Sequence, residues 1–334
     1  MKPLTAGLWA LLLLFAALTA EATETTLRIT LQLPLKSHIG QNLLLFKTEV
    51  ERSSQGEIAI EIYDSAQLYK DNEVPQAVGS GAIEMGVASL TRFAGEIPAV
   101  DIFDVPFMFN TEALVRAVTA QNSPIRGPID VAILATGSRV LWWQAYGNAI
   151  LLSKGSPLKN PADMQGKKVR VFGKTLGRFV EAVGGIPELI SGSDQYEAYK
   201  NGTVDIGMTG VSSIESRALW QVMDWITATN HADIEFVVLI NEPFWQALPD
   251  KHKKIIVQAA TKADAAVRDA IYQIEAQAYA FAVEQGMSTY TLTPEEIKAW
   301  KAVAQPIVDE YLADAGKLGR QIYDAVLKLQ EETR

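Results

Sequence analysis

Residues that perform acid–base or metal chemistry are sparse in this sequence of 334 residues. It contains no cysteine, which excludes disulfides, thiol nucleophiles and cysteine metal sites. Its histidines are His38, His231 and His252, and none has a second histidine at the spacing of a metal site. The motifs of serine hydrolases, zinc proteases, dinucleotide-binding proteins and P-loop enzymes do not occur. We therefore expect a binding protein without catalysis, metal or cofactor, and keep an exported hydrolase or lyase using Asp or Glu with His38 or His231 as an alternative.

Two pairs of neighbouring carboxylates, Asp101 with Asp104 and Asp233 with Glu235, could share acid–base work in principle. The chain has 39 acidic residues, however, and that number produces close pairs by chance. We therefore expect these pairs to lie on the solvated surface.

Arg170 is the strongest single candidate for binding chemistry. It lies in Lys168-Val-Arg-Val171, a short strand whose Val169 and Val171 would face the core, so that Arg170 points the other way. A guanidinium group is planar and always charged, and two of its N–H groups can bind one carboxylate side by side. A structural ion pair with Asp194 or Glu197 is the competing interpretation.

Alternating strands and helices must position these residues. Leu27, Ile29, Leu31 and Leu33 alternate with polar residues, which predicts a half-buried strand over 26–33. Further expected elements are helices over 39–53, 72–80 and 111–120, and strands over 58–62, 83–88 and 140–145. Strands that alternate with helices favour a largely parallel sheet covered on both faces.

A second lobe is expected to begin near Gly147. Its expected elements are an extended segment over 148–153, strands over 168–172, 188–190 and 204–208, and helices over 175–183 and 193–200. The strand over 234–241 is expected to return to the first lobe, which makes the lobes discontinuous in sequence.

A very long helix is expected over 250–285. This segment has no Gly or Pro, and its apolar residues recur in alternating steps of four and three. At 1.5 Å per residue it would reach about 54 Å, enough to lie across both lobes. The tail from Pro294 is also expected to be helical, with Thr293 as its N-terminal cap.

The N-terminus resembles a secretory signal, with Lys2, an apolar run over 8–18 and small residues around Ala22. The run is shorter than the roughly 20 residues that span a bilayer. A composition with 48% hydrophobic and 21% charged residues is that of a globular protein. The net charge of −9 argues against nucleic acid and anionic lipid as partners.

Several segments together resemble one family. The segment Gly166-Lys-Lys-Val-Arg170-Val is similar to the Gly-x-Lys-x-Arg-Val strand of DctP-type solute receptors, which serve TRAP (tripartite ATP-independent periplasmic) transporters. Other family marks occur in the same order: Ser65-Ala-Gln-Leu68, Gly184-Gly-Ile-Pro187, Asp194-Gln-Tyr-Glu-Ala198, Asn201-Gly-Thr-Val-Asp205, Asn230-His231 and Trp245-x-x-Leu248-Pro249. The resemblance covers the chain from about Thr26 onwards.

This resemblance implies an α/β, two-lobed periplasmic-binding-protein fold with a long helix spanning both lobes. It also implies a carboxylate ligand held by Arg170. The chain departs from the family at two positions: Ala149 stands where a second basic residue is common, and Thr209 stands where an asparagine is usual. Loss of one cation favours a monocarboxylate over a dicarboxylate, and leaves an amino-alcohol ligand open.

Other candidate ligand-binding residues follow from their positions near expected strand ends and in the hinge. Together with Arg170 and Thr209 they are Gln32, His38, Glu73, Ser89, Trp142, Gln144, Asn148, Phe172 and Asp233. For Trp142 the reason is that consecutive tryptophans face opposite sides of a strand, so that one can be core and the other can stack on a ligand.

We thus expect a signal peptide over 1–22, cleaved near Ala22, lobe I over 23–146 and lobe II over 147–233. Residues 234–334 are expected to hold the returning strand, the spanning helix and the C-terminal helices. The expected function is a periplasmic receptor that captures a small organic acid and delivers it to TRAP transporter membrane subunits. A receptor of the same fold that signals to a membrane sensor is an alternative.

Overall fold

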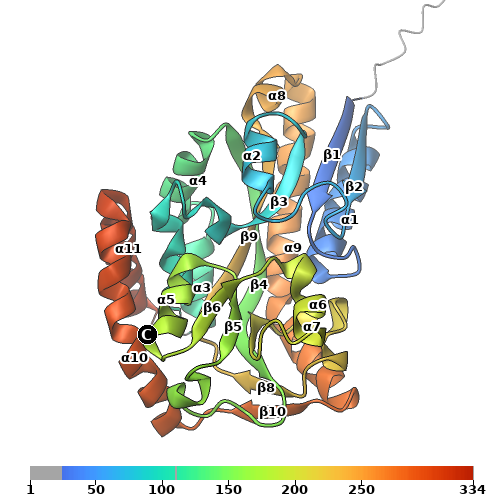
Figure 1. Ribbon diagram of the computed structural model, residues 1–334. Coiled ribbons are helices and arrows are strands. Elements are labelled where there is room, and N and C mark those ends of the chain that lie inside the picture. The colour runs from blue at the N-terminus through green and yellow to red at the C-terminus, as the bar shows by residue number, and fades with distance from the viewer. Residues whose placement is uncertain (1–24, 110, 334) are drawn as a thin grey trace, which may run out of the picture.

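The computed structural model describes residues 25–109 and 111–333, so the predicted signal segment lies outside the described residues. Its fold is α/β, and one long strand, β4 (Ser138–Ser153), belongs to two sheets (Figure 1). We call the part of the chain around the first sheet lobe I and the part around the second sheet lobe II.

The sheet of lobe I has the strand order β2-β1-β3-β9-β4. Its strands besides β4 are β1 (Thr25–Leu31), β2 (Ile58–Tyr63), β3 (Met85–Ser89) and β9 (Asp233–Asn241). β1 is parallel to β2 and β3, whereas β9 is antiparallel to both β3 and β4. The sheet, which was expected to be largely parallel, is mixed: β1, β2, β3 and β4 run in one direction, and β9 runs between β3 and β4 in the other.

The second half of β4 builds lobe II. It pairs antiparallel with β7 (Gly207–Gly210) and with β8 (Trp225–Ala228), and β10 (Ser288–Thr291) lies outside β8. A small parallel pair, β5 (Lys168–Val171) and β6 (Ile186–Leu189), joins this sheet through a bridge from Val169 to Ile206.

Gly147 lies at the point where β4 passes from one lobe to the other. The sequence suggested two extended segments on either side of it, and the structure joins them in one continuous strand. The register against β9 shifts between Ala145 and Gly147, and Gly147 has a φ of +96°. A Cβ atom at this position would also lie 2.5 Å from Oε1 of Glu275. Only glycine allows both the positive φ and the close approach of the Glu275 side chain.

Helices cover both faces of the lobe I sheet: α1 (His38–Ser53), α2 (Val74–Gly79), α3 (Glu112–Thr119) and α4 (Arg126–Leu134). Trp142 and Trp143 do face opposite sides of β4, and both are fully buried in hydrophobic clusters. Trp142 packs against Phe46, with ring centroids 4.6 Å apart, and Trp143 packs edge-on against Phe103.

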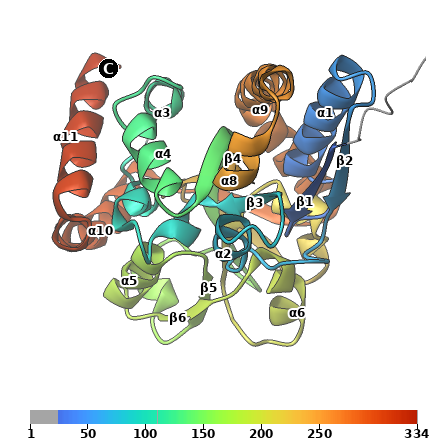
Figure 2. The ribbon, with the colours of Figure 1, turned by 90° about the horizontal axis from the view of Figure 1, so that it is seen from above.

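Shorter helices surround the lobe II strands. They are α5 (Lys174–Ala182), α6 (Gln195–Lys200) and α7 (Ser213–Ser216), and α8 (Glu242–Ala247) follows β9 at the top of Figure 1. Figure 2 shows α5 and α6 on the same side of the molecule, with β5 and β6 between them.

The predicted long helix is confirmed as α9 (Asp250–Glu284). It contacts α1 and β4 near lobe I and α7 and β10 in lobe II, and it runs along the whole molecule in Figure 1. α10 (Pro294–Asp314) begins as predicted at Thr293, whose side chain forms a capping box with Glu296, and α11 (Gly316–Glu332) ends the described chain. Across the described residues, no helix is both long and apolar enough to cross a membrane.

Candidate functional site

Arg170 lies on β5 where the two lobes meet, over the ring of Phe172, which lines a small hollow together with Ser89 and Asp104 of lobe I. We call this junction of the lobes the cleft. Its neighbours Val169 and Val171 are buried in the hydrophobic cluster, and the Arg170 side chain itself is only 4% exposed. Nε donates a hydrogen bond to the carbonyl of Ile190 (2.9 Å) and Nη1 donates to that of Met208 (2.5 Å). The guanidinium carbon also lies 5.4 Å from the centre of the Phe172 ring. These contacts fix the plane of the guanidinium group.

The charge of Arg170 has no carboxylate partner in the described part of the chain. Both partners suggested by the sequence pair elsewhere, Asp194 with Lys70 and Glu197 with Lys200. Burial, with a smaller contribution from the positive charge of Arg217, lowers the pKa of Arg170 to about 10. A buried cation is unfavourable unless an anion pairs with it.

Arg217 is a second cation in this cleft, and the sequence analysis missed it. It follows α7, outside any recognisable motif. Nη2 donates to the hydroxyl of Tyr146 (2.5 Å), and Nη1 donates to the carbonyl of Gly192 (3.0 Å) and to Gln195. Nε is buried and has no hydrogen-bond acceptor among the described residues. All these partners are neutral, so the charge of Arg217 is also uncompensated there.

Other buried polar atoms near the two arginines lack partners within residues 25–109 and 111–333. They are Oη of Tyr199, Nε2 of Gln195 and Nδ1 of His38. Burial raises the pKa of Tyr199, and the positive charges of Arg170 and Arg217 oppose this shift. The charge of Arg217 also contributes to the lowered pKa of His38. The Tyr199 hydroxyl and the Gln195 amide are donors without acceptors beside two guanidinium groups, an environment suited to an anion, whereas Nδ1 of His38 is an acceptor because Nε2 donates to Ala145.

His38 is the first residue of α1, after the N-cap Ser37. Its Nε2 lies 3.1 Å from the carbonyl of Ala145, and its ring packs against that of Tyr146 with centroids 5.1 Å apart. Burial lowers the pKa of His38 to about 4, although its bond to Ala145 opposes the shift. His38 is therefore neutral near pH 7.

A third arginine, Arg92, approaches the cleft from lobe I, but it is paired. Its Nε donates to Oδ2 of Asp71 (2.5 Å), and Asp71 also accepts hydrogen bonds from the amide and the hydroxyl of Ser89. Asp71 is fully buried and Ser89 is 5% exposed. The predicted residue Ser89 is thus held in a rigid ion-pair network at the end of β3.

The two carboxylate pairs that were expected on the surface are buried, so that expectation is wrong. Asp101, Asp104, Asp233 and Glu235 are each 3–4% exposed. Asp101 and Asp104 lie in a 3₁₀ helix (Pro98–Asp104), and Asp233 and Glu235 begin β9. Sequence spacing could not reveal their burial, because contacting residues such as Thr175 beside Asp101 and Arg268 beside Glu235 are far away in sequence.

The lobes are closed against each other. Polar contacts cross the cleft from Lys70 to Asp194 (2.9 Å), from the Ser191 hydroxyl to Gln32 (3.1 Å), and from the Thr175 hydroxyl to Asp101 (2.8 Å). Two glycines permit this approach. A Cβ atom at Gly192 would lie 2.8 Å from Oε1 of Gln32, and one at Gly173 would overlap Oδ2 of Asp104.

The structure brings seven of the predicted site residues to this cleft or its walls: Arg170, Thr209, Gln32, His38, Ser89, Phe172 and Asp233. Thr209 is 2% exposed and donates to Ser213 from the strand whose Met208 carbonyl binds Arg170.

The other four predicted residues lie elsewhere. Trp142 and Gln144 are fully buried and both donate to Asn42 of α1. Glu73 is exposed and accepts a hydrogen bond from the amide of Lys70. The backbone amide of Asn148 donates to Glu275, at the edge of a separate cavity of about 370 Å³.

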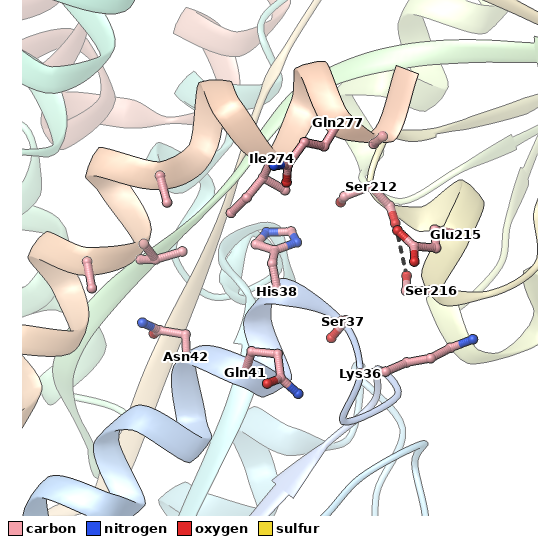
Figure 3. Close-up of a pocket in the computed structure, with 14 residues that line it drawn as sticks. Lys36, Ser37, His38, Gln41, Asn42, Ser212, Glu215, Ser216, Ile274 and Gln277 are labelled. Atoms are coloured by element: carbon pink, nitrogen blue, oxygen red, sulfur yellow. Dashed lines mark hydrogen bonds between the residues drawn. The ribbon is translucent and has the colours of Figure 1, made fainter. Parts of the chain in front are cut away.

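A groove of about 410 Å³ lies on the other side of His38. Figure 3 shows the residues of its walls, which come from the start of α1 and the two residues before it, from α7 and its N-cap, and from α9: Lys36, Ser37, His38, Gln41, Asn42, Ser212, Glu215, Ser216, Ile274 and Gln277. His38 lines this groove and packs its ring against Tyr146, whose hydroxyl accepts a hydrogen bond from Arg217, so the groove lies next to the arginine site.

A two-lobed α/β fold with uncompensated cations in its cleft is typical of receptors that close on a small anion. Comparisons with known proteins place the chain within one such class. The family model described as bacterial extracellular solute-binding protein, family 7 (DctP), matches residues 30–314. The chain belongs to this family, the DctP-type extracytoplasmic solute-binding proteins of TRAP transporters, and is a receptor rather than an enzyme.

The similar proteins agree in length and fold. The C4-dicarboxylate-binding periplasmic protein DctP of Rhodobacter capsulatus is 27% identical over 291 residues, which cover 86% of this chain and 85% of that protein. DctP7 of Bordetella pertussis, which binds pyroglutamic acid, superimposes with a TM-score of 0.86 at 20% identity, covering 91% of this chain and 99% of that one. The sugar acid binding protein DctPAm of Advenella mimigardefordensis, in complex with galactonate, gives 0.87 at 23% identity, covering 92% and 99%. At these identities the superpositions show the fold alone.

Proposed function

We propose that this protein captures a small organic acid between its lobes, with the carboxylate of the ligand held by Arg170 and Arg217. The observation that carries the proposal is that both guanidinium groups have only neutral partners in the described part of the chain. A carboxylate is the anion that matches a fixed, planar guanidinium group best. Tyr199 and Gln195 would supply further hydrogen bonds to it.

The preferred ligand has a single carboxylate. Ala149 is fully buried in β4 and supplies no cation, while Arg217 reaches the cleft from lobe II, the same lobe as Arg170. Both guanidinium groups would thus bind the carboxylate at one end of the ligand. The opposite wall, which includes Asp104 and Asp233, offers no basic side chain to a second carboxylate.

Similar proteins support the ligand class. Those compared above bind C4-dicarboxylates, pyroglutamic acid and galactonate, all of which carry a carboxylate. We also propose that the chain is exported and cleaved near Ala22, acts in the periplasm, and delivers its ligand to TRAP membrane subunits. The division into lobe I (23–146) and lobe II (147–233), with a hinge at Gly147, belongs to the same proposal.

The test is a thermal-shift and calorimetry screen of the purified protein with succinate, pyroglutamate, galactonate and lactate at pH 7. At least one acid should raise the Tm of the wild type, and Arg170→Ala should abolish this rise while the apo protein stays folded. Arg217→Ala should weaken binding about tenfold or more, the loss of one charged hydrogen-bond pair. Arg52→Ala is the matched control, because Arg52 is exposed at the far end of α1. An unchanged acid response in Arg170→Ala would refute the assignment.

A further inference from the structure

A small hollow adjoins the arginine site at the junction of the lobes. Asp104 and Ser89 line it from lobe I, Asp233 and Glu235 from the start of β9, and Phe172 from lobe II. It offers about 10 Å³ to the centre of a water molecule, room for roughly one water in this closed form. A ligand would therefore enter it when the lobes part.

Asp104 is the unusual group in this hollow. Its side chain is buried, with 3% exposed, and no basic residue of the described chain forms an ion pair with it. Its Oδ2 has no hydrogen-bond donor. Burial, and then the charge of Asp101, raise the pKa of Asp104 well above the usual value. Asp104 thus favours its neutral form, although the charge of Arg92 opposes this shift, and it has no ion-pair partner within the described chain.

Neighbouring carboxyl groups differ in this respect. Asp101 accepts hydrogen bonds from the hydroxyls of Thr91 (2.9 Å) and Thr175 (2.8 Å). Glu235 is held by both Nη atoms of Arg268, at 2.6 and 2.7 Å. Asp233 stands beside Glu235, and its Oδ2 has no donor among the groups described here. The unpartnered oxygens of Asp104 and Asp233 belong to residues that line the same hollow.

The hollow and the arginine site share one wall. Phe172 lines the hollow, and the guanidinium group of Arg170 lies over the same ring, 5.4 Å from its centre. Arg170 and Phe172 are two residues apart, and two residues of extended chain span about 7 Å. A ligand of a few carbon atoms could therefore reach the arginines with one end and Asp104 with the other.

We propose that the ligand is zwitterionic, with its carboxylate on Arg170 and Arg217 and a protonated amino group on Asp104. This inference rests on the proposed function and adds the chemistry of the ligand's second end. An ammonium group would give Asp104 the counter-charge and the donor that the fold does not supply. A second carboxylate there would meet the carboxyl groups of Asp104 and Asp233, and a hydroxyl would supply no positive charge to favour the charged form of Asp104.

The test compares acids that differ only at the second group. The probes are three pairs of increasing length: alanine with lactate, 3-aminopropanoate with 3-hydroxypropanoate, and 4-aminobutanoate with 4-hydroxybutanoate, with succinate as the dianionic reference. Calorimetry on the wild-type protein at pH 7 should give at least one amino acid a Kd about tenfold or more below that of its hydroxy partner. Succinate should bind more weakly than that amino acid.

Asp104→Asn should remove this preference and leave the affinity for the hydroxy acid within about threefold, since the amide keeps the shape of the carboxylate but loses its charge. Asp194→Asn is the matched control: Asp194 is an exposed carboxylate at the cleft rim, paired with Lys70, and its loss should weaken all probes equally. Because the wild-type comparison needs no variant, the inference stays testable even if Asp104→Asn folds poorly.

The outcomes separate the two proposals. If acids bind, but every amino acid has the same Kd as its hydroxy partner or as succinate, the zwitterion inference is wrong. The proposed organic-acid receptor would still stand. A preference for amino acids that persists in Asp104→Asn would likewise overturn the role of Asp104. If no probe and no acid of the earlier screen binds, both proposals fail together.

Discussion

The molecule contains two kinds of buried or half-buried arginine, and they differ in what faces them. Along α9, Arg268 is held by both oxygens of Glu235, and Arg126 donates to Asp264 (2.8 Å). In the cleft, Arg170 and Arg217 meet only backbone carbonyls, an amide oxygen and a hydroxyl. The first kind joins elements of the fold, and the second kind is suited to an external anion.

Their ionisation reflects the same difference. Burial lowers the pKa of Arg268, but the charge and the hydrogen bonds of Glu235 outweigh burial, and the net shift is upward. Burial lowers the pKa of Arg170 to about 10, and no carboxylate compensates it. An arginine placed for stability gains its counter-ion within the chain, whereas one placed for binding is left without it.

The largest expected effect lies on the α9 side. Arg268→Met would leave the buried Glu235 without a partner and next to Asp233, so we expect the free energy of unfolding to fall by about 3–5 kcal/mol. Urea denaturation measures it. Arg116→Met is the control, because Arg116 forms only exposed ion pairs with Glu112 and Asp269 and should change stability by about 1 kcal/mol or less. A loss for Arg268→Met as small as that of the control would contradict the structural role.

A second prediction concerns closure around the unpaired arginines. Gly173 has an ordinary extended backbone, with φ −146° and ψ 160°, so alanine is locally tolerated there. In the closed form, however, its Cβ would overlap Asp104 and lie 2.6 Å from Oγ1 of Thr91. We expect Gly173→Ala to fold normally and to lower affinity about tenfold, equivalent to about 1.4 kcal/mol. Calorimetry with the acid that most stabilises the wild type measures this.

Gly177 offers a matched control one turn further along α5. A Cβ atom there would lie 3.6 Å from its nearest neighbour, an ordinary contact. Gly177→Ala should therefore keep wild-type affinity. Equal affinity in both variants would show that ligand binding does not need the lobes to approach as closely as they do in this structure.

Periodicity predicted the fold well because it reports burial within single elements. The long helix over 250–285 and the cap at Thr293 were predicted within a residue or so, since continuous patterns and local hydrogen bonds define them. The direction of β9 was not predictable, because strand polarity depends on where the chain returns from. The sequence also predicted two extended segments where the structure has the single strand β4. In a sequence, a glycine at a β-bulge with positive φ is indistinguishable from a glycine that ends a strand.

The candidate site was predictable only in part. Arg170 was found because a strand pattern and a family motif coincide there. Arg217 was missed, since nothing local distinguishes it from a surface arginine after a short helix. Asp104 was assigned to the surface because its burial arises from contact with Gly173, a residue far away in sequence. Groups that meet only across the cleft leave no periodic signal.

The smallest expected effect is that of Arg170→Met on the free energy of unfolding of the apo protein. It tests the difference between the two kinds of arginine most directly. The lowering of the Arg170 pKa from 12.5 to about 10 corresponds to about 3 kcal/mol that the fold loses by burying this charge. Removing the charge restores this energy, but it also leaves the carbonyls of Ile190 and Met208 without their donor, at about 1–3 kcal/mol each. The restored energy of about 3 kcal/mol opposes a combined loss of about 2–6 kcal/mol, so urea denaturation should show a net loss of about 1 kcal/mol at the middle of this range. A loss as large as that of Arg268→Met would mean that Arg170, too, is part of the framework, and the distinction between the two kinds of arginine would fail.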